Sequence, residues 1–163
     1  MLQSEAARLF IPLRTLLLKL GPIIIGDNNL IEEQVYIVNR RKEGDPPDSE
    51  IVMTIGNNNV FEVGSYSEAL VIGNNNVLES KSKLGRYTEL TSGCVIGAMC
   101  DVSTHEKLKE NTVIYGRTCE RRIQNEKPAT QTLQLDFLTK VLPNYHYFWK
   151  PSKGEQVLQQ LKK

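Results

Sequence analysis

The residues best suited to chemistry are two histidines, His105 and His146, and three cysteines. His105 precedes Glu106, and a histidine beside a carboxylate can act as a general base. A three-histidine zinc site needs one more histidine than the chain has. The odd number of cysteines, without a CxxC pair, fits reduced intracellular thiols better than a disulfide framework. These residues therefore favour no catalytic or metal centre, and we expect no cofactor.

The composition is that of one domain with an appendage. The chain has 163 residues, 40% of them hydrophobic, and a formal net charge of +1. A charge this small gives no reason to expect nucleic-acid binding. No apolar run reaches the roughly 18 residues that a membrane-spanning helix needs, so we expect no membrane insertion.

Asparagine-rich segments of nearly the same sequence recur three times. They are Ile-Gly-Asp-Asn-Asn-Leu at 25–30, Ile-Gly-Asn-Asn-Asn-Val at 55–60 and the same six residues at 72–77. Asparagine tolerates left-handed backbone torsions, so these segments predict tight turns between apolar strands. A sugar or metal site is the alternative, but recurrence at one phase of a repeat favours turns whose stacked asparagines form side-chain ladders.

A six-residue period of apolar residues positions these turns. Neither a helix nor a flat strand explains this period, which predicts short strands joined by corners, three to an 18-residue coil. One residue is lost between Phe61 and Ile72. Small residues, Cys94 and Cys100 among them, precede many anchors by two positions, as crowded corners require. The anchors are Ile25, Ile31, Ile37, Ile55, Phe61, Ile72, Leu78, Leu84, Leu90, Ile96, Val102, Leu108 and Ile114.

The chain therefore divides into a solenoid and its flanks. Residues 21–116 form the solenoid, and the charged, proline-containing segment 39–50 is an inserted loop. Residues 1–20 predict a helix that caps the open end, although their basic character also resembles a weak mitochondrial presequence. Residues 117–130 are a linker.

The C-terminal segment combines a predicted helix with an aromatic cluster. In residues 131–146, Thr132 can begin a helix and Pro143 is expected to end it. Residues 147–163 are expected to form a mobile basic tail. The apolar surface exceeds what one helix can hide, so we expect it to bind a partner. The predicted partner-binding residues are Phe137, Leu138, Tyr145, Tyr147, Phe148 and Trp149.

Several of these motifs together resemble the dynactin subunit 6 family. They are Asn-Asn-Val-Phe-Glu-Val-Gly (58–64), Gly-Asn-Asn-Asn-Val-Leu-Glu-Ser-Lys (73–81), Leu-Thr-Ser-Gly-Cys-Val-Ile-Gly-Ala (90–98), Glu-Asn-Thr-Val-Ile-Tyr-Gly (110–116) and the ending Leu-Pro-Asn-Tyr-His (142–146). The resemblance covers about residues 21–146. Family members carry further coils ahead of the segment that matches residue 21, so residues 1–20 depart from the family and suggest an alternative or truncated product.

The resemblance implies an all-β solenoid, a left-handed parallel β-helix, acting as a non-catalytic subunit in the pointed-end complex of dynactin. The implied partners are dynactin subunit 5, dynactin subunit 4 and the pointed-end actin-related protein, and indirectly dynein and cargo adaptors. The implied location is the cytoplasm and cytoskeleton. The alternative is an enzyme of the same fold, an acyltransferase or γ-carbonic-anhydrase-like protein, which would act as a homotrimer through a histidine.

Overall fold

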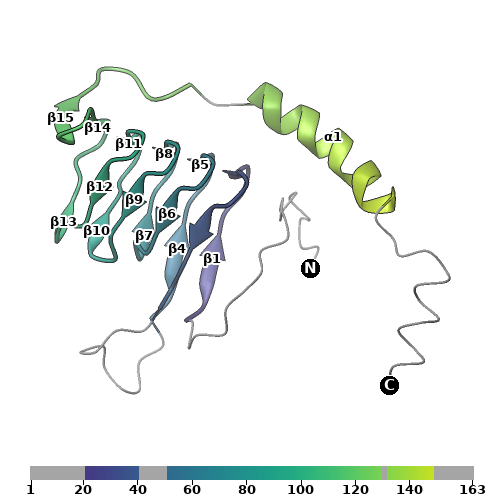
Figure 1. Ribbon diagram of the computed structural model, residues 1–163, viewed down its shortest axis with the longest axis horizontal. Coiled ribbons are helices and arrows are strands. Elements are labelled where there is room, and N and C mark those ends of the chain that lie inside the picture. Colours follow the sequence, from purple (N-terminus) through teal and green to yellow (C-terminus); the bar gives the residue numbers. More distant parts are fainter. Residues whose placement is uncertain (1–20, 41–50, 130–131, 149–163) are drawn as a thin grey trace, which may run out of the picture. The chain divides into compact units, whose positions relative to one another are not determined.

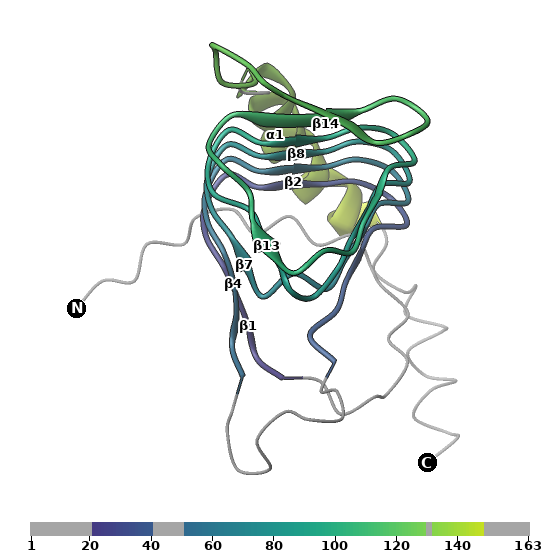
Figure 2. The same ribbon diagram turned by 90° about the vertical axis from the view of Figure 1, so that its left-hand side faces the viewer.

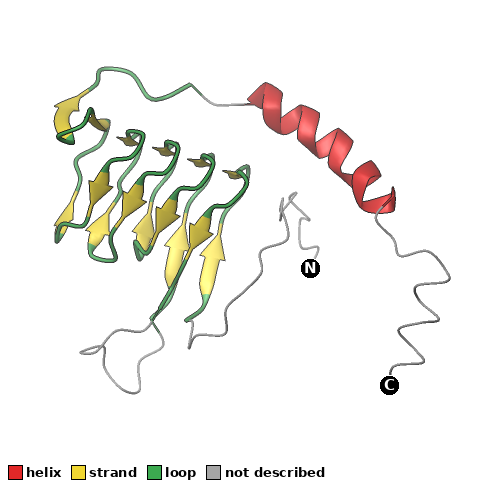
Figure 3. Cartoon of the chain, viewed as in Figure 1, coloured by secondary structure: helices red, strands yellow, loops and turns green. Residues whose placement is uncertain are grey.

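A computed structural model describes residues 21–40, 51–129 and 132–148. The chain divides into two compact units, residues 1–130 and residues 131–163. The described part of the first unit is a solenoid of short strands, and that of the second is a single helix, α1 (Thr132–Phe148) (Figures 1 and 3). The expected helix over residues 1–20, the loop residues 41–50 and the tail from residue 149 lie outside the described residues.

The solenoid is built from coils whose short strands lie on the three sides of a triangular prism (Figure 2), and the first four coils each supply one strand to every side. The strands are β1 (Ile23–Ile25), β2 (Leu30–Ile31), β3 (Tyr36–Ile37), β4 (Met53–Ile55), β5 (Val60–Phe61), β6 (Tyr66–Ser67), β7 (Val71–Ile72), β8 (Val77–Leu78), β9 (Lys83–Leu84), β10 (Thr88–Glu89), β11 (Val95–Ile96), β12 (Asp101–Val102), β13 (Glu106–Lys107), β14 (Thr112–Tyr115) and β15 (Glu120–Ile123).

The strands of each side form a parallel sheet. The first side is β1-β4-β7, continued through the bridge between Ile72 and Leu90 into β10-β13. The second side is β2-β5-β8-β11-β14, and the third is β3-β6-β9-β12. The chain winds left-handed, so the predicted fold class, a left-handed parallel β-helix with a C-terminal helix, is confirmed.

The hexapeptide anchors fill the prism, as predicted. Leu78 pairs with Ile96, which pairs with Ile114, and all three side chains are fully buried. One anchor position is polar. Ser67 occupies it, since this residue lies in register between the anchors Ile37 and Leu84. The lost residue of the repeat falls just after this serine. Met53 and Ala69 belong to the same core cluster, so residues outside the six-residue phase complete the packing there.

The asparagine segments form the corner between the first and second sides. Asn28, Asn58 and Asn75 have φ near +57° (56°, 57° and 56°), the left-handed conformation that the sequence predicts. The glycine before each turn is needed because of close approach. A Cβ on Gly73, for example, would lie 2.0 Å from the carbonyl oxygen of Thr91 in the next coil.

The predicted asparagine ladder is confirmed and lies inside this corner. The Asn59 amide nitrogen Nδ2 donates to Asn29 Oδ1 at 3.0 Å, and Asn76 Nδ2 donates to Asn59 Oδ1 at 3.1 Å. Each amide oxygen also accepts from the backbone N–H one coil further on, and the Cys94 N–H is the last donor at 2.8 Å. The ladder thus satisfies buried polar groups that no water reaches.

A carboxylate ladder stabilises the corner between the second and third sides. In the first three coils the residue that follows the second-side anchor is a glutamate, and each glutamate accepts a hydrogen bond from a backbone N–H of the next coil. Glu32 accepts from Val63 at 2.9 Å, Glu62 from Ser80 at 2.9 Å and Glu79 from Ala98 at 2.8 Å. Hydrogen bonds to a charged acceptor are stronger than those between neutral groups.

The third corner depends on a buried arginine that no sequence pattern predicts. Arg86 is 3% exposed, and its Nη1 donates to Asn39 Oδ1 at 3.2 Å. The Asn39 amide in turn donates to the carbonyl oxygens of Pro22 and Ile51, at 2.9 and 2.7 Å. Asn39, the first residue of the expected inserted loop, is therefore buried, and it joins the chain segments on either side of that loop.

Two asparagine substitutions in one turn test the ladder. Asn76→Asp replaces the donating amide with a carboxylate that faces Asn59 Oδ1 and the Thr91 carbonyl oxygen, both acceptors. We expect a loss of about 3 kcal/mol in the free energy of unfolding, measured by denaturant titration. Asn74→Asp is the matched control. The Asn74 side chain is exposed and accepts a hydrogen bond from the Asn57 N–H through its oxygen, which an aspartate also provides. Equal stability of the two variants would contradict the ladder.

Candidate interaction surfaces

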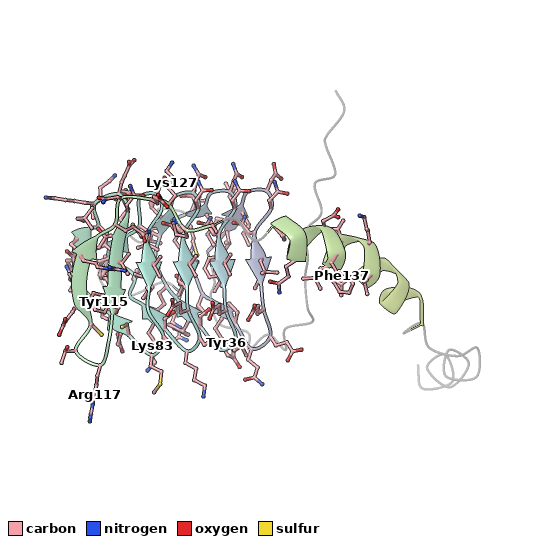
Figure 4. The ribbon with its side chains drawn as sticks, turned by 90° about the horizontal axis from the view of Figure 1, so that it is seen from above. Tyr36, Lys83, Tyr115, Arg117, Lys127 and Phe137 are labelled. Atoms are coloured by element: carbon pink, nitrogen blue, oxygen red, sulfur yellow. The ribbon has the colours of Figure 1, made fainter. Side chains whose placement is uncertain are left out.

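The structure describes the side chains of only two predicted partner-binding residues, Phe137 and Leu138, and both lie on α1. Phe137 is 62% exposed, which is unusual for so large an apolar side chain, and Figure 4 shows it projecting from the helix. Leu138 is half-buried. Tyr145, Tyr147 and Phe148 lie within the helix backbone but their side chains are not described, and Trp149 lies outside the described residues.

The expectation that Pro143 ends the helix is wrong, because α1 runs through this residue to Phe148. A proline inside a helix removes one backbone donor and usually kinks or breaks the helix, but this cost does not terminate α1. The end of a helix is therefore a weakly determined feature of this sequence.

Continuation of the helix changes how the aromatic cluster is arranged. Residues three, four and seven apart share a helix face. Tyr145 is four positions after Val141 and seven after Leu138, and Phe148 is seven after Val141, so these aromatic positions extend the apolar stripe. Tyr147 does not follow this spacing. On the opposite face, Asp136 and Lys140 form an exposed ion pair at 2.7 Å. The stripe contains positions 138, 141, 142, 145 and 148.

An exposed apolar patch on the first side of the solenoid was not predicted. It consists of Ile24, Val52 and Val71, which are 60%, 37% and 41% exposed. Ile24 and Val71 lie in register through Thr54. Further along the same side, the outward positions are charged, and Lys107 binds Glu89. For Ile24 and Val71, the available signal was an apolar residue directly before an anchor, a position that points outward in a strand.

The outward positions of the second side are different, since all five are aliphatic. They pair in register from coil to coil. Leu30 is only 1% exposed although it alternates with the core anchor Ile31, and neither it nor Val60 belongs to the core cluster. The row therefore forms a second apolar layer outside the prism. Its members are Leu30, Val60, Val77, Val95 and Val113.

The third side has mixed outward residues. Tyr36 and Lys83 both project from this side (Figure 4), and Lys83 lies 4.0 Å from Asp101 of the next coil. The three sides thus differ in outward chemistry: part apolar and part charged, fully aliphatic, and mixed aromatic and charged.

His105 and Glu106, the residues that could imitate a catalytic base, are engaged elsewhere. The His105 ring stacks on Tyr87 one coil away, with ring centroids 4.4 Å apart and an interplanar angle of 16°. Glu106 accepts two hydrogen bonds from the Arg121 guanidinium, at 2.7 and 2.8 Å, and one from Thr104. The arrangement is a cross-link between strands rather than a histidine–carboxylate pair.

Arg121 comes from β15, a strand that lies within the expected linker 117–130. β15 folds back antiparallel on β14, with Ile114 opposite Arg121. Because Ile114 points into the core, Arg121 lies over the end of the prism and reaches Glu106 on the first side. Hydrogen bonds from Arg121 and from Thr104 lower the pKa of Glu106. The bidentate pair fastens the closing strand to the last coil.

No group of three His, Cys, Asp or Glu side chains in the described part of the chain is placed to hold a metal ion. Within the same residues, α1 is neither long nor apolar enough to cross a bilayer, and no other helix is described.

These features define the class of protein: a hexapeptide-repeat β-helix with an appended helix and differently composed outer faces. No protein-family model matches the chain. Curated proteins do match, and three of them are named dynactin subunit 6. The chain is 59% identical over 147 residues to that of Nematostella vectensis, 57% over 137 residues to that of Xenopus tropicalis and 53% over 147 residues to that of Danio rerio. The matches cover 88%, 82% and 88% of this chain and 79%, 68% and 75% of those proteins. The chain belongs to the dynactin subunit 6 family, as the sequence motifs predicted.

The bond between Arg121 and Glu106 predicts a pH-dependent stability. A carboxyl whose pKa is lowered in the folded state contributes stability above its unfolded pKa, about 4.3, and this contribution is lost as the pH falls through the folded pKa. Both side chains are partly exposed, so Arg121→Gln should cost only about 0.5–1 kcal/mol at pH 7. The difference from the parent chain should disappear near pH 3, as measured by thermal unfolding across this range.

Arg122→Gln is the matched control. The Arg122 guanidinium lies 5.5 Å from the centroid of the Tyr115 ring, and it forms no ion pair with another described residue. Any loss of stability in this variant should be the same at pH 7 and pH 3. A pH-independent loss in Arg121→Gln would show that the ion pair does not stabilise the closing strand.

Proposed function

We propose that the chain is a non-catalytic structural subunit of the dynactin complex, located in its pointed-end complex, and that it supports dynein-driven cargo transport along microtubules in the cytoplasm. The observation that carries this proposal is 59% identity over 147 residues to a protein named dynactin subunit 6. The location and the transport role follow from the resemblance of the sequence motifs to that family.

The architecture supports a scaffolding role. The coils are joined by the asparagine ladder, the carboxylate ladder and the Arg86–Asn39 bond, one at each corner. In a repeat solenoid each unit contacts only its neighbours, so bonds between coils determine how rigid the rod is. A rod of this kind keeps its outer faces in fixed register for other proteins to bind.

A non-catalytic role is supported by the surroundings of His105. A general base must be able to accept a proton from a substrate within hydrogen-bonding reach. The His105 ring instead packs on Tyr87, and its neighbouring carboxylate is bound to Arg121 and Thr104. Nothing in the part of the chain that the structure describes favours the acyltransferase or carbonic-anhydrase alternative.

The proposed partners are dynactin subunit 5, dynactin subunit 4 and the pointed-end actin-related protein, with dynein and cargo adaptors as indirect partners. We assign the partner contact to the predicted set of Phe137, Leu138, Tyr145, Tyr147, Phe148 and Trp149. The exposure of Phe137 supports this choice, since exposed aromatic side chains often become the central residues of an interface. The spacing of Tyr145 and Phe148 along the stripe of α1 also supports it.

A double substitution in α1 tests the partner surface. Tyr145→Ala combined with Phe148→Ala should reduce co-purification of the chain with the pointed-end subunits at least tenfold, because each central aromatic residue of an interface contributes about 2 kcal/mol or more. The β-rich circular dichroism spectrum should stay unchanged.

Asp136→Ala combined with Lys140→Ala is the matched control, because it removes an exposed ion pair on the face opposite the apolar stripe. This variant should co-purify like the parent chain. The assignment of the partner surface would be contradicted if the aromatic double variant co-purified with the pointed-end subunits as efficiently as the parent chain. Collapse of its fold would contradict the assignment as well.

The mass of the purified chain in solution separates the two classes of function. A structural subunit should be a monomer that associates with a different chain when dynactin subunit 5 is added, as measured by light scattering. An enzyme of this fold would form a homotrimer by itself, and a stable homotrimer would contradict the proposed function.

A further inference from the structure

Two of the three cysteines lie together at the C-terminal end of the solenoid. Cys100 is fully buried in the corner before β12, and Cys119 is half-buried in the turn between β14 and β15. Cys119 packs against the core cluster that contains Cys100. Both residues are free thiols in the structure.

A shared hydrogen-bond acceptor fixes the two cysteines near each other. The Cys100 thiol donates to the Gly116 carbonyl oxygen at 3.4 Å, and the Cys119 backbone N–H donates to the same oxygen at 3.2 Å. The turn between them is tight, since Gly116 and Cys119 have φ of 75° and 53°. Left-handed torsions are uncommon for cysteine. In this turn they reverse the chain direction, so that Cys119 lies next to the coil that contains Cys100.

The pKa of the Cys100 thiol is raised to about 11, mainly by burial and in addition by the neighbouring Cys119 side chain. Cys100 is therefore protonated near neutral pH and reacts slowly with oxidants, because the thiolate is the nucleophile. Cys119 is the more exposed of the two and is the first thiol that an oxidant in solution can reach.

We propose that Cys100 and Cys119 form a disulfide within the chain when the protein is exposed to hydrogen peroxide. The Cys119 thiolate attacks one peroxide oxygen, the O–O bond breaks, and hydroxide leaves and takes up a proton to form water. The resulting sulfenic acid then reacts with the Cys100 sulfur, which loses its proton as the S–S bond forms and a second water leaves. Two thiols are oxidised, and one peroxide is reduced to two waters.

The bond would act on β15, which begins directly after Cys119. In the reduced protein, the ladder to β14 and the exposed pair of Arg121 and Glu106 hold this strand. A disulfide adds a covalent link between the turn and the preceding coil. Opening of the closing strand would then be suppressed under oxidising conditions. This inference does not depend on the proposed role in dynactin.

Thiol counting on the full chain tests the proposal. The unfolded reduced chain should show three reactive thiols, and the chain treated with hydrogen peroxide in its folded state should show one. Trypsin releases Cys119 in residues 118–121 and both other cysteines in residues 87–107, so mass spectrometry should find these peptides joined. Amide hydrogen exchange in residues 120–123 should slow in the oxidised protein.

Cys94 provides the matched control, because it is buried in a different corner, with its sulfur 3.4 Å from the Lys109 carbonyl oxygen. Cys94→Ser should still form the joined peptide, whereas Cys100→Ser should not. The proposal is overturned if the parent keeps three thiols after oxidation, if the joined peptide persists in Cys100→Ser, or if only disulfides between separate chains form.

Discussion

Backbone amides in the solenoid form hydrogen bonds to the neighbouring coils in both directions along the chain. On the sides of the prism, some amides donate forward, as Val60 does to Asn76, and others donate backward, as Met53 does to Pro22. The left-handed corner residues donate backward, as Asn75 does to Asn57 and Met99 to Ser80. Every coil is therefore tied to both neighbours through its corners as well as its sides. This constraint explains why residues that tolerate a positive φ recur in the sequence at the same phase as the anchors.

The sequence contained most of the solenoid, because its constraints repeat. Anchors at a fixed spacing, and asparagines at one phase, each predict a position that the structure confirms, such as Leu90 paired with Ile72. Features that occur once were not predictable in this way. Arg86 is buried beside Asn39, which is distant in sequence, and β15 pairs with β14 and is fastened by the bond from Arg121 to Glu106. The helix through Pro143 departs from the rule that a proline ends a helix, so its true end was not predictable from that rule.

The candidate surface was predictable only in part, for a related reason. A buried anchor position accepts few residue types, whereas an outward position accepts many. The repeat therefore indicates where a surface lies but not what binds it. The exposed Ile24 and Val71, and the aliphatic row that includes Leu30, occupy equivalent outward positions and yet differ greatly in exposure. The assignment of α1 to the partner contact rests on its aromatic positions and on the exposed Phe137. In the function proposed above, the solenoid keeps its outer faces in register and α1 binds the partner.

Amide hydrogen exchange, compared between the free chain and the chain incorporated in dynactin, tests this division of tasks most directly. Amides that donate between central coils, such as those of Asn76 and Val77, should exchange slowly in both states, because the bonds between coils are already complete in the free chain. Amides of α1 should become slower on incorporation. If the central amides exchange rapidly in the free chain and become protected only in the assembly, the solenoid is not a preformed scaffold and the central claim is wrong.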